Sequence, residues 1–191
     1  MPVDLIVFTA DRRIRGAIPL ADDRVSDMLN SVPRIVIRGA QLEDVVHGGP
    51  EQVADVTITV GSIVAVLASG RRGIENLRRR TDVHKARLGL VRYTVTGWLH
   101  IPAGADANLA SHEPSAVLAG RDILVPLTDA TITYDKAGEA VTEQFETILI
   151  NRSQAAWIDL HDAAGGDDGD AVDERPKVYH AAMAKDFTGA T

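Results

Sequence analysis

The sequence contains no cysteine, which excludes disulfides, zinc–thiolate sites and thiol nucleophiles. Aromatic residues make up only 4% of the 191 residues, so the core must consist mainly of Val, Ile, Leu and Ala. No apolar run approaches the roughly 20 residues that a membrane-spanning helix needs. The N-terminal segment 1–13 has no basic region ahead of its short apolar run, unlike a signal peptide. We therefore expect a soluble protein of the cytoplasm.

The formal net charge of −7 disfavours non-specific attraction to nucleic acid or to an anionic membrane, and we predict no membrane partner. The charge is unevenly distributed, however. Segment 71–92 carries a local excess of Lys and Arg, whereas 159–174 has seven Asp or Glu residues and no cation. The basic segment is either a candidate polyanion-binding patch or a solvated linker that the acidic segment neutralises. The candidate polyanion-binding residues are Arg71, Arg72, Arg78, Arg79, Arg80, Lys85 and Arg87.

Three apolar blocks recur in the same order, which is the signature of an internal duplication. The blocks lie at offsets of 81, 90 and 91 residues, and the first contains a glycine, Gly16 or Gly97, at the same place in both copies. The paired blocks are 13–20 with 94–101, 35–45 with 125–135, and 57–67 with 148–158.

Alternating apolar residues and turn residues predict an all-β protein. The expected architecture is two tandem small domains, each a barrel-like or rolled antiparallel sheet related by the duplication. The predicted division is a first β repeat at 1–69, a basic linker at 70–89, a second β repeat at 90–160, and an acidic linker with a C-terminal arm at 161–191.

Local signals place the turns and breaks within each repeat. Residues 10–11 predict a hairpin turn, and Gly138 predicts another inside 134–141. Gly16 and Gly97 predict bulges or close backbone approaches. A single helical turn is expected within 22–32, with Ser26 as its cap.

The sequence 122–135 interrupts an apolar run with Pro126, Thr128 and Asp129. Proline cannot donate to a strand ladder, so we place Pro126 at an edge or a bulge. Thr128 and Asp129 can bind local backbone amides and turn the chain. We therefore predict a corner in the sheet, and we prefer this to the alternative that Asp129 is a catalytic acid.

Several short motifs are similar to those of a family of short bacterial all-β proteins of unknown function. They are the turn Arg24 to Asn30 (RVSDMLN), the corner Leu127-Thr128-Asp129-Ala130, and the pair Asn151-Arg152. Each copy holds only half of the family pattern. The resemblance implies a fold unit and no activity.

No motif for catalysis, cofactor binding or metal binding is present. The chain has no P-loop, no GxGxxG and no nucleophile elbow, and its six histidines form no ligand pair at helical spacing. The acidic run after residue 160 does not have the spacing of a calcium loop. We predict no catalytic residue, no cofactor and no metal site.

The resulting functional hypothesis is a non-enzymatic interaction or scaffold subunit, self-associating as a homo-oligomer or part of a larger complex. Tyr179, Met183 and Phe187 recur at helical spacing in the C-terminal arm and are candidate partner-binding residues. The alternative is a nucleic-acid-binding small barrel that uses segment 71–92. A third hypothesis, an enzyme with a pocket between the repeats, has no motif to support it.

Overall fold

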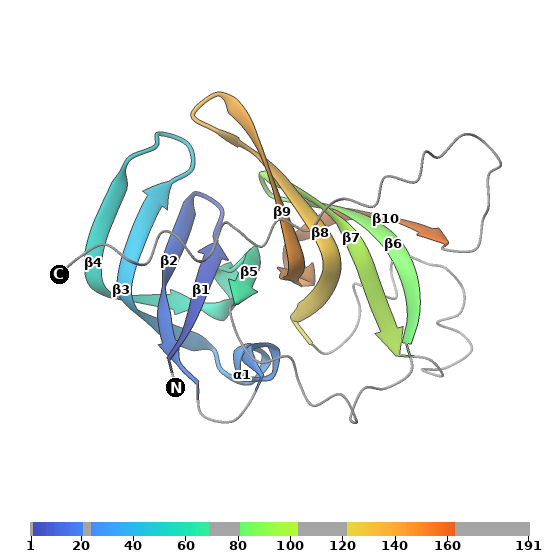
Figure 1. The fold of residues 1–191 in the computed structure, drawn as a ribbon, viewed down its shortest axis with the longest axis horizontal. Coiled ribbons are helices and arrows are strands. Elements are labelled where there is room, and N and C mark those ends of the chain that lie inside the picture. Colours follow the sequence, from blue (N-terminus) through green and yellow to red (C-terminus); the bar gives the residue numbers. More distant parts are fainter. Residues whose placement is uncertain (1, 21–23, 69–80, 103–121, 163–191) are drawn as a thin grey trace.

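The computed structural model describes residues 2–20, 24–68, 81–102 and 122–162. These residues form one antiparallel sheet of ten strands with a single short α-helix (Figure 1), so the predicted all-β class is confirmed. The elements, in chain order, are β1 (Pro2–Phe8), β2 (Arg12–Pro19), α1 (Val25–Ser31), β3 (Arg34–Asp44), β4 (Pro50–Thr59), β5 (Ala65–Ala68), β6 (Thr81–Leu90), β7 (Tyr93–Pro102), β8 (Leu124–Lys136), β9 (Glu139–Asn151) and β10 (Ala155–Asp162). The 3-10 turns η1 (Val60–Ser62) and η3 (Arg152–Gln154) precede β5 and β10.

The sheet is built from two groups of five strands. The order along the sheet is β10-β6-β7-β8-β9-β5-β1-β2-β3-β4. The first group is β5-β1-β2-β3-β4 and the second group is β10-β6-β7-β8-β9, so in each group the last strand of the chain order lies beside the first. The groups join where β5 pairs with β9. The predicted barrels do not close: among the described strands, β4 and β10 lie at the two ends of one continuous sheet (Figure 1), because each is hydrogen-bonded on one side only.

The predicted hairpins are confirmed. The N–H of Thr9 donates to the carbonyl of Arg12 and the N–H of Arg12 donates to the Thr9 hydroxyl, so residues 10–11 form the turn between β1 and β2. The turn between β8 and β9 has positive φ at Ala137 and at Gly138, as a tight hairpin turn requires.

Gly16 and Gly97 each lie at a bulge, as predicted. In the β2–β3 pair, Gly16 stands opposite two residues, Gly39 and Ala40. In the β7–β8 pair, Gly97 stands opposite Asp129 and Ala130. A Cβ atom on Gly16 would lie 2.5 Å from Ile37 Cγ2, so the close approach requires glycine.

The break at Pro126, Thr128 and Asp129 is this second bulge. Asp129 adopts φ of +47°, the left-handed conformation that an Asp side chain tolerates, and the corresponding residue in β3 is Gly39, at φ +56°. Pro126 lies beyond the last β7–β8 pair, Leu99 with Leu127, so its missing N–H faces no β7 partner.

The strand register places the third pair of apolar blocks one residue away from the alignment that the sequence pattern predicts. Ile58 pairs with Ile35, and Ile150 pairs with Val125, a residue that lies 90 positions after Ile35. Corresponding positions in β4 and β9 are therefore 92 residues apart rather than 91. The sequence match aligned Ser62 with Ser153, and a one-residue slip of this kind exchanges the two faces of a strand.

Two further sequence expectations differ from the structure. The basic linker was expected to extend through residue 89, yet β6 begins at Thr81, because 81–90 pairs along its length with β7. Helix α1 forms where expected, but its cap residue is Arg24, without a side-chain hydrogen bond, and Ser26 lies inside the helix. The helix is held instead by its buried residues Val25 and Leu29.

The core consists of two apolar clusters that share strands. On β5, Val66 contributes to the cluster of the first group, whereas Ala65 and Leu67 contribute to the cluster of the second. On β9 the pattern is the same, since Leu149 faces the first cluster and Ile150 the second. The alternation of side chains along a strand thus links the two cores across the β5–β9 junction.

Candidate interaction site

The outer edges of β4 and β10 are the candidate interaction site. Within the part of the chain that the structure describes, each strand is hydrogen-bonded to one neighbouring strand, and its other side faces no further strand. The strands have 10 and 8 residues, long enough to template a further strand. Such edges bind other chains by adding a strand to the sheet.

The β10 edge carries an exposed aromatic side chain. Trp157 is 45% exposed and lies over Gly89 of β6, where a Cβ atom would come within 2.2 Å of the indole nitrogen. The guanidinium carbon of Arg87 lies 5.8 Å from the centroid of the Trp157 ring. Lys85 is exposed two residues before Arg87, so both cations lie on the face of β6 that Trp157 covers.

The β4 edge is mostly exposed. Ile58 is its one buried residue, and the neighbouring Val36 of β3 is 45% exposed. The N–H of Val60 donates to the carbonyl of Pro33, in line with the pairing of Ile58 and Ile35. Because donors alternate along an antiparallel strand, the N–H groups of Thr57 and Thr59 point away from β3, toward the free side.

The β5–β9 junction is the place where an end strand of one group pairs with an end strand of the other. In the strand order, β5 has the position of β10, and β9 has the position of β4. Ala65 stands opposite Ile150 and Val66 opposite Leu149. The N–H of Asn151 donates to the carbonyl of Val64 at 2.9 Å. The fully buried side chain of Asn151 also donates to the carbonyl of Ile63 at 2.7 Å, so side-chain and backbone hydrogen bonds fix this register.

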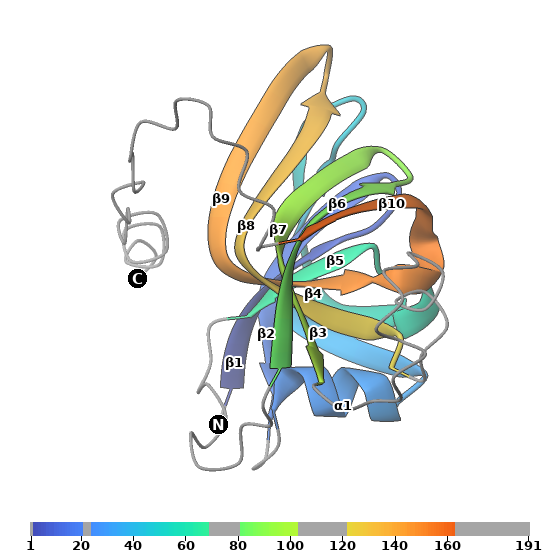
Figure 2. The same ribbon diagram turned by 90° about the vertical axis from the view of Figure 1, so that its right-hand side faces the viewer.

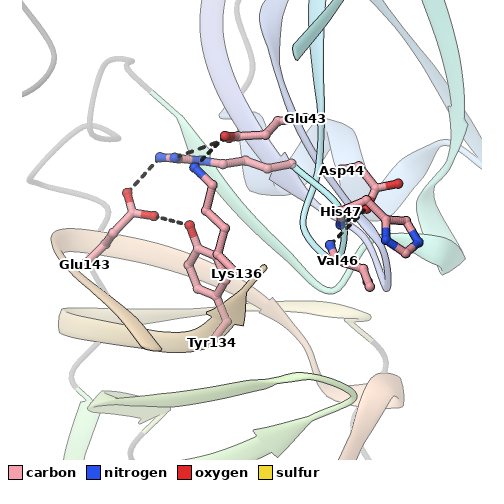
Figure 3. A network of polar contacts seen from close by, with 8 residues as sticks. Glu43, Asp44, Val46, His47, Tyr134, Lys136 and Glu143 are labelled. Atoms are coloured by element: carbon pink, nitrogen blue, oxygen red, sulfur yellow. Dashed lines mark hydrogen bonds and ion pairs between the residues drawn. The ribbon is translucent and has the colours of Figure 1, made fainter. Parts of the chain in front are cut away.

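A polar network holds the β8–β9 hairpin against β2 and β3 (Figure 3). Nη2 of Arg13, a residue only 9% exposed, lies 2.7 Å from Oε2 of Glu143. The Tyr134 hydroxyl donates to the other carboxylate oxygen of Glu143 at 2.7 Å. Lys136 pairs with Glu43 of β3, which also lies 3.9 Å from Arg13. The network therefore connects residues of both groups of strands.

Burial raises the pKa of the two tyrosines near this network, Tyr134 and Tyr93. Loss of solvent around Tyr134, followed by its hydrogen bond to Glu143, raises the pKa of its hydroxyl. Burial likewise raises the pKa of Tyr93, whose hydroxyl donates to the carbonyl of Thr9 at 2.8 Å. Both hydroxyls donate hydrogen bonds to groups on other elements, which is a structural role.

A polar groove of about 630 Å³ lies beside the network, between the β8–β9 hairpin and β2, β3 and β4, which approach one another in Figures 1 and 2. Its lining is polar and charged, and it includes the carboxylate of Glu43 and the amine of Lys136. The charged side chains there bind each other, as in the pair of Glu43 and Lys136. The groove is lined by Arg13, Arg15, Gly16, Gly39, Gln41, Glu43, Pro50, Gln52 and Lys136.

The predicted site residues are only partly within the described ranges. Lys85 and Arg87 lie on β6 and are exposed. The predicted polyanion-binding residues Arg71, Arg72, Arg78, Arg79 and Arg80 lie outside the described residues, as do the predicted partner-binding residues Tyr179, Met183 and Phe187.

His100 and Asp129, two polar residues with candidate chemistry, have local structural contacts. His100 Nε2 lies 2.8 Å from the Thr128 hydroxyl, and Asp129 occupies the bulge described above.

Across residues 2–20, 24–68, 81–102 and 122–162, no group of three or more His, Asp or Glu side chains could hold a metal ion. In the same ranges no helix is long and apolar enough to cross a membrane.

Sequence reasoning missed two residues, Trp157 at the β10 edge and Arg13 in the buried polar network. Trp157 falls within the third block and was not singled out, and the structure leaves its side chain 45% exposed on the last strand of the sheet. Arg13 gave no local signal, because its partner Glu143 lies 130 residues away.

Comparisons of the chain with protein-family models, curated proteins and solved structures find no match. The resemblance to the family of short bacterial proteins therefore stays a prediction.

Proposed function

We propose that this chain is a non-enzymatic protein-interaction module that self-associates through the outer edges of β4 and β10. The observation that carries the proposal is the open ten-stranded sheet, in which the long end strands β4 and β10 each have one strand neighbour among the described residues. Strand addition uses backbone hydrogen bonds for affinity and side-chain pockets for specificity, so it needs no catalytic constellation.

We further propose that the two groups of strands are copies of one ancestral unit. Their identical strand order and their glycine bulges at Gly16 and Gly97 support this origin. Two hydrogen bonds recur at positions 92 residues apart. Ile63 N–H donates to the carbonyl of Val60, and Ala155 N–H donates to that of Arg152. Such a unit pairs edge to edge within the chain, which makes pairing between chains a natural extension.

The self-association is tested by sedimentation velocity of the full chain over a hundredfold range of concentration. We expect the weight-average mass to rise above 20.5 kDa as the concentration increases. A mass that stays at 20.5 kDa throughout would contradict self-association.

One observation favours a second candidate, nucleic-acid binding. The exposed ring of Trp157 lies beside Arg87 and near Lys85, and aromatic faces flanked by cations bind single-stranded nucleic acids. Binding of a labelled single-stranded oligonucleotide, measured at low and at physiological salt, tests it. Affinity that falls steeply with salt and is lost in Trp157→Ala would support this candidate, and no binding at low salt would remove it.

A further inference from the structure

We infer that copies of this chain associate head to tail, with the outer edge of β10 in one copy paired antiparallel to the outer edge of β4 in the next. In the inferred register, Trp157 stands opposite Ile58 of the next copy, and Ile158 stands opposite Thr57. The inference rests on the proposed function and specifies its edges, its register and its symmetry.

The register follows from the junction inside the chain. At that junction β5 and β9 pair through Ala65 with Ile150 and Val66 with Leu149. Strand β10 occupies in its group the place that β5 occupies in the other, and β4 corresponds in the same way to β9. Among the described strands, the outer edges of β10 and β4 are therefore the counterparts of the two edges that pair at the β5–β9 junction.

Corresponding residues are identified by their neighbours in the sheet. Ala65 pairs with Phe8 of β1, and Trp157 pairs with Gly89 of β6. Trp157 is therefore the counterpart of Ala65, and Ile58 is the counterpart of Ile150 by the register described above. Because Ala65 pairs with Ile150 inside the chain, Trp157 is expected to pair with Ile58 of the next copy.

The backbone donors agree with this register. The N–H of Asn151 donates to the carbonyl of Val64 at the internal junction. Its counterpart is the N–H of Thr59, which points to the free side of β4, and the expected acceptor is the carbonyl of Ala156. A hydrogen-bonded pair then follows two residues along, between Thr57 and Ile158.

The large and the small side chain change places between the internal β1–β5 pair and the β6–β10 pair at the edge. At the internal junction a large residue on β1, Phe8, pairs with a small residue on β5, Ala65. At the β10 edge the small residue Gly89 is on β6 and the large Trp157 is on β10. Phe8 is fully buried because the second cluster covers it, whereas Trp157 is 45% exposed. In the head-to-tail contact, Trp157 would be covered by Ile58 and the half-buried Val56 of the next copy.

A contact of two different edges is heterologous, so it extends into a filament or closes into a ring instead of stopping at a two-fold dimer. This property distinguishes it from pairing of β4 with β4 or of β10 with β10. A symmetric contact could join two copies that carry the same single cysteine, whereas a head-to-tail contact joins only different positions.

Cysteine cross-linking of the full chain tests the inference, because the natural sequence has no cysteine. The variants are Thr57→Cys and Ile158→Cys, whose Cα atoms would lie about 5.5 Å apart in a hydrogen-bonded pair, within the range of a disulfide. Under mild oxidation we expect a disulfide dimer when the two single variants are mixed, and a ladder of oligomers from the double variant. Asp159→Cys is the matched control, because this neighbouring side chain points to the other face of β10 and should not cross-link to Thr57→Cys.

The outcomes separate the inference from the proposed function. Sedimentation that shows oligomers, together with no disulfide in the mixture or with dimers from one single variant alone, overturns the head-to-tail register and leaves self-association standing. A strict monomer at all concentrations overturns both.

A proline variant gives a test that does not depend on disulfide geometry. Thr57→Pro removes an N–H on the free side of β4 and leaves the ladder with β3 intact, whereas Thr57→Ala keeps this donor. We expect Thr57→Pro to raise the dissociation constant by roughly tenfold or more and Thr57→Ala to change it little, with both variants folded by circular dichroism. Equal association of the folded Thr57→Pro variant and the natural chain would overturn the inference.

Discussion

Arg13 and Glu143 form a close ion pair, 2.7 Å between Nη2 and Oε2, across 130 residues of sequence. The pair joins β2 to β9, and its guanidinium lies 5.6 Å from the ring centroid of Phe8. A buried cation held by one carboxylate at hydrogen-bond distance makes that carboxylate important for stability.

We expect Glu143→Ala to lower the free energy of unfolding by about 2 kcal/mol, because Arg13 and Tyr134 both lose their partner. Glu143→Gln should have a smaller effect, since an amide oxygen can still accept the Tyr134 hydrogen bond. Denaturant unfolding measures both. Equal stability of the natural protein and Glu143→Ala would show that Glu43, 3.9 Å from Arg13, is a sufficient partner.

The two bulge glycines should differ in their tolerance of alanine. A Cβ atom on Gly16 would lie 2.5 Å from Ile37 Cγ2 and 2.8 Å from the carbonyl of Arg38, whereas on Gly97 its nearest contact would be 3.0 Å. We expect Gly16→Ala to destabilise by about 2–3 kcal/mol and Gly97→Ala by roughly 1 kcal/mol. Gly61→Ala is the control, since no atom lies within 4 Å of its added Cβ. The reverse order, measured by thermal unfolding, would contradict this geometry.

Asn30 should contribute to the contact of α1 with β8. Its side chain accepts from the N–H of Leu124 at 2.8 Å and donates to the carbonyl of the same residue at 3.0 Å. Asn30→Ala removes both bonds and should cost about 1–2 kcal/mol. Asn30→Asp keeps the acceptor but sets a carboxylate against the Leu124 carbonyl, so it should not restore stability. Full stability of Asn30→Asp in denaturant unfolding would argue against a role for the donated bond.

Asp44 should make part of the stability dependent on pH. The backbone N–H of His47, with smaller help from Val46 and Arg12, lowers the pKa of its carboxyl below 3.8, against a partial opposing effect of burial. A carboxyl whose pKa is lower in the folded than in the unfolded state stabilises the fold above the unfolded value, and this contribution is lost as the pH falls through the folded value.

In Asp44→Asn the amide oxygen can accept the same hydrogen bonds without a charge. We therefore expect the unfolding free energy of Asp44→Asn to fall less than that of the natural protein between pH 5 and pH 2. Parallel pH profiles of the two proteins would show that Asp44 does not contribute.

The conformational preferences of single residues and the alternation of apolar residues predicted the turns and bulges of the sheet. The turn at residues 10–11, the bulges at Gly16 and Gly97, and the corner at Asp129 each depend on the conformational preference of one or two residues, so they can be read locally. The continuity of the sheet could not be predicted, because the β5–β9 junction contains only two paired positions on each strand, Ala65 with Ile150 and Val66 with Leu149.

Charge composition misled the prediction of the linker. The cations Lys85 and Arg87 alternate with Ala86 and Leu88, which are fully buried, and this alternation is a strand signal that the charge run concealed. The edge location of Trp157 depends on strand order, which no local pattern specifies.

The sharing of β1, β5 and β9 between two cores has a consequence for how the molecule comes apart. Removing either group would leave side chains such as Phe8 or Leu149 uncovered on the survivor, so neither half is a self-sufficient folding unit. We therefore expect a destabilising substitution in one group of strands to lower the stability of the other group as well, and the two groups to unfold in one cooperative transition.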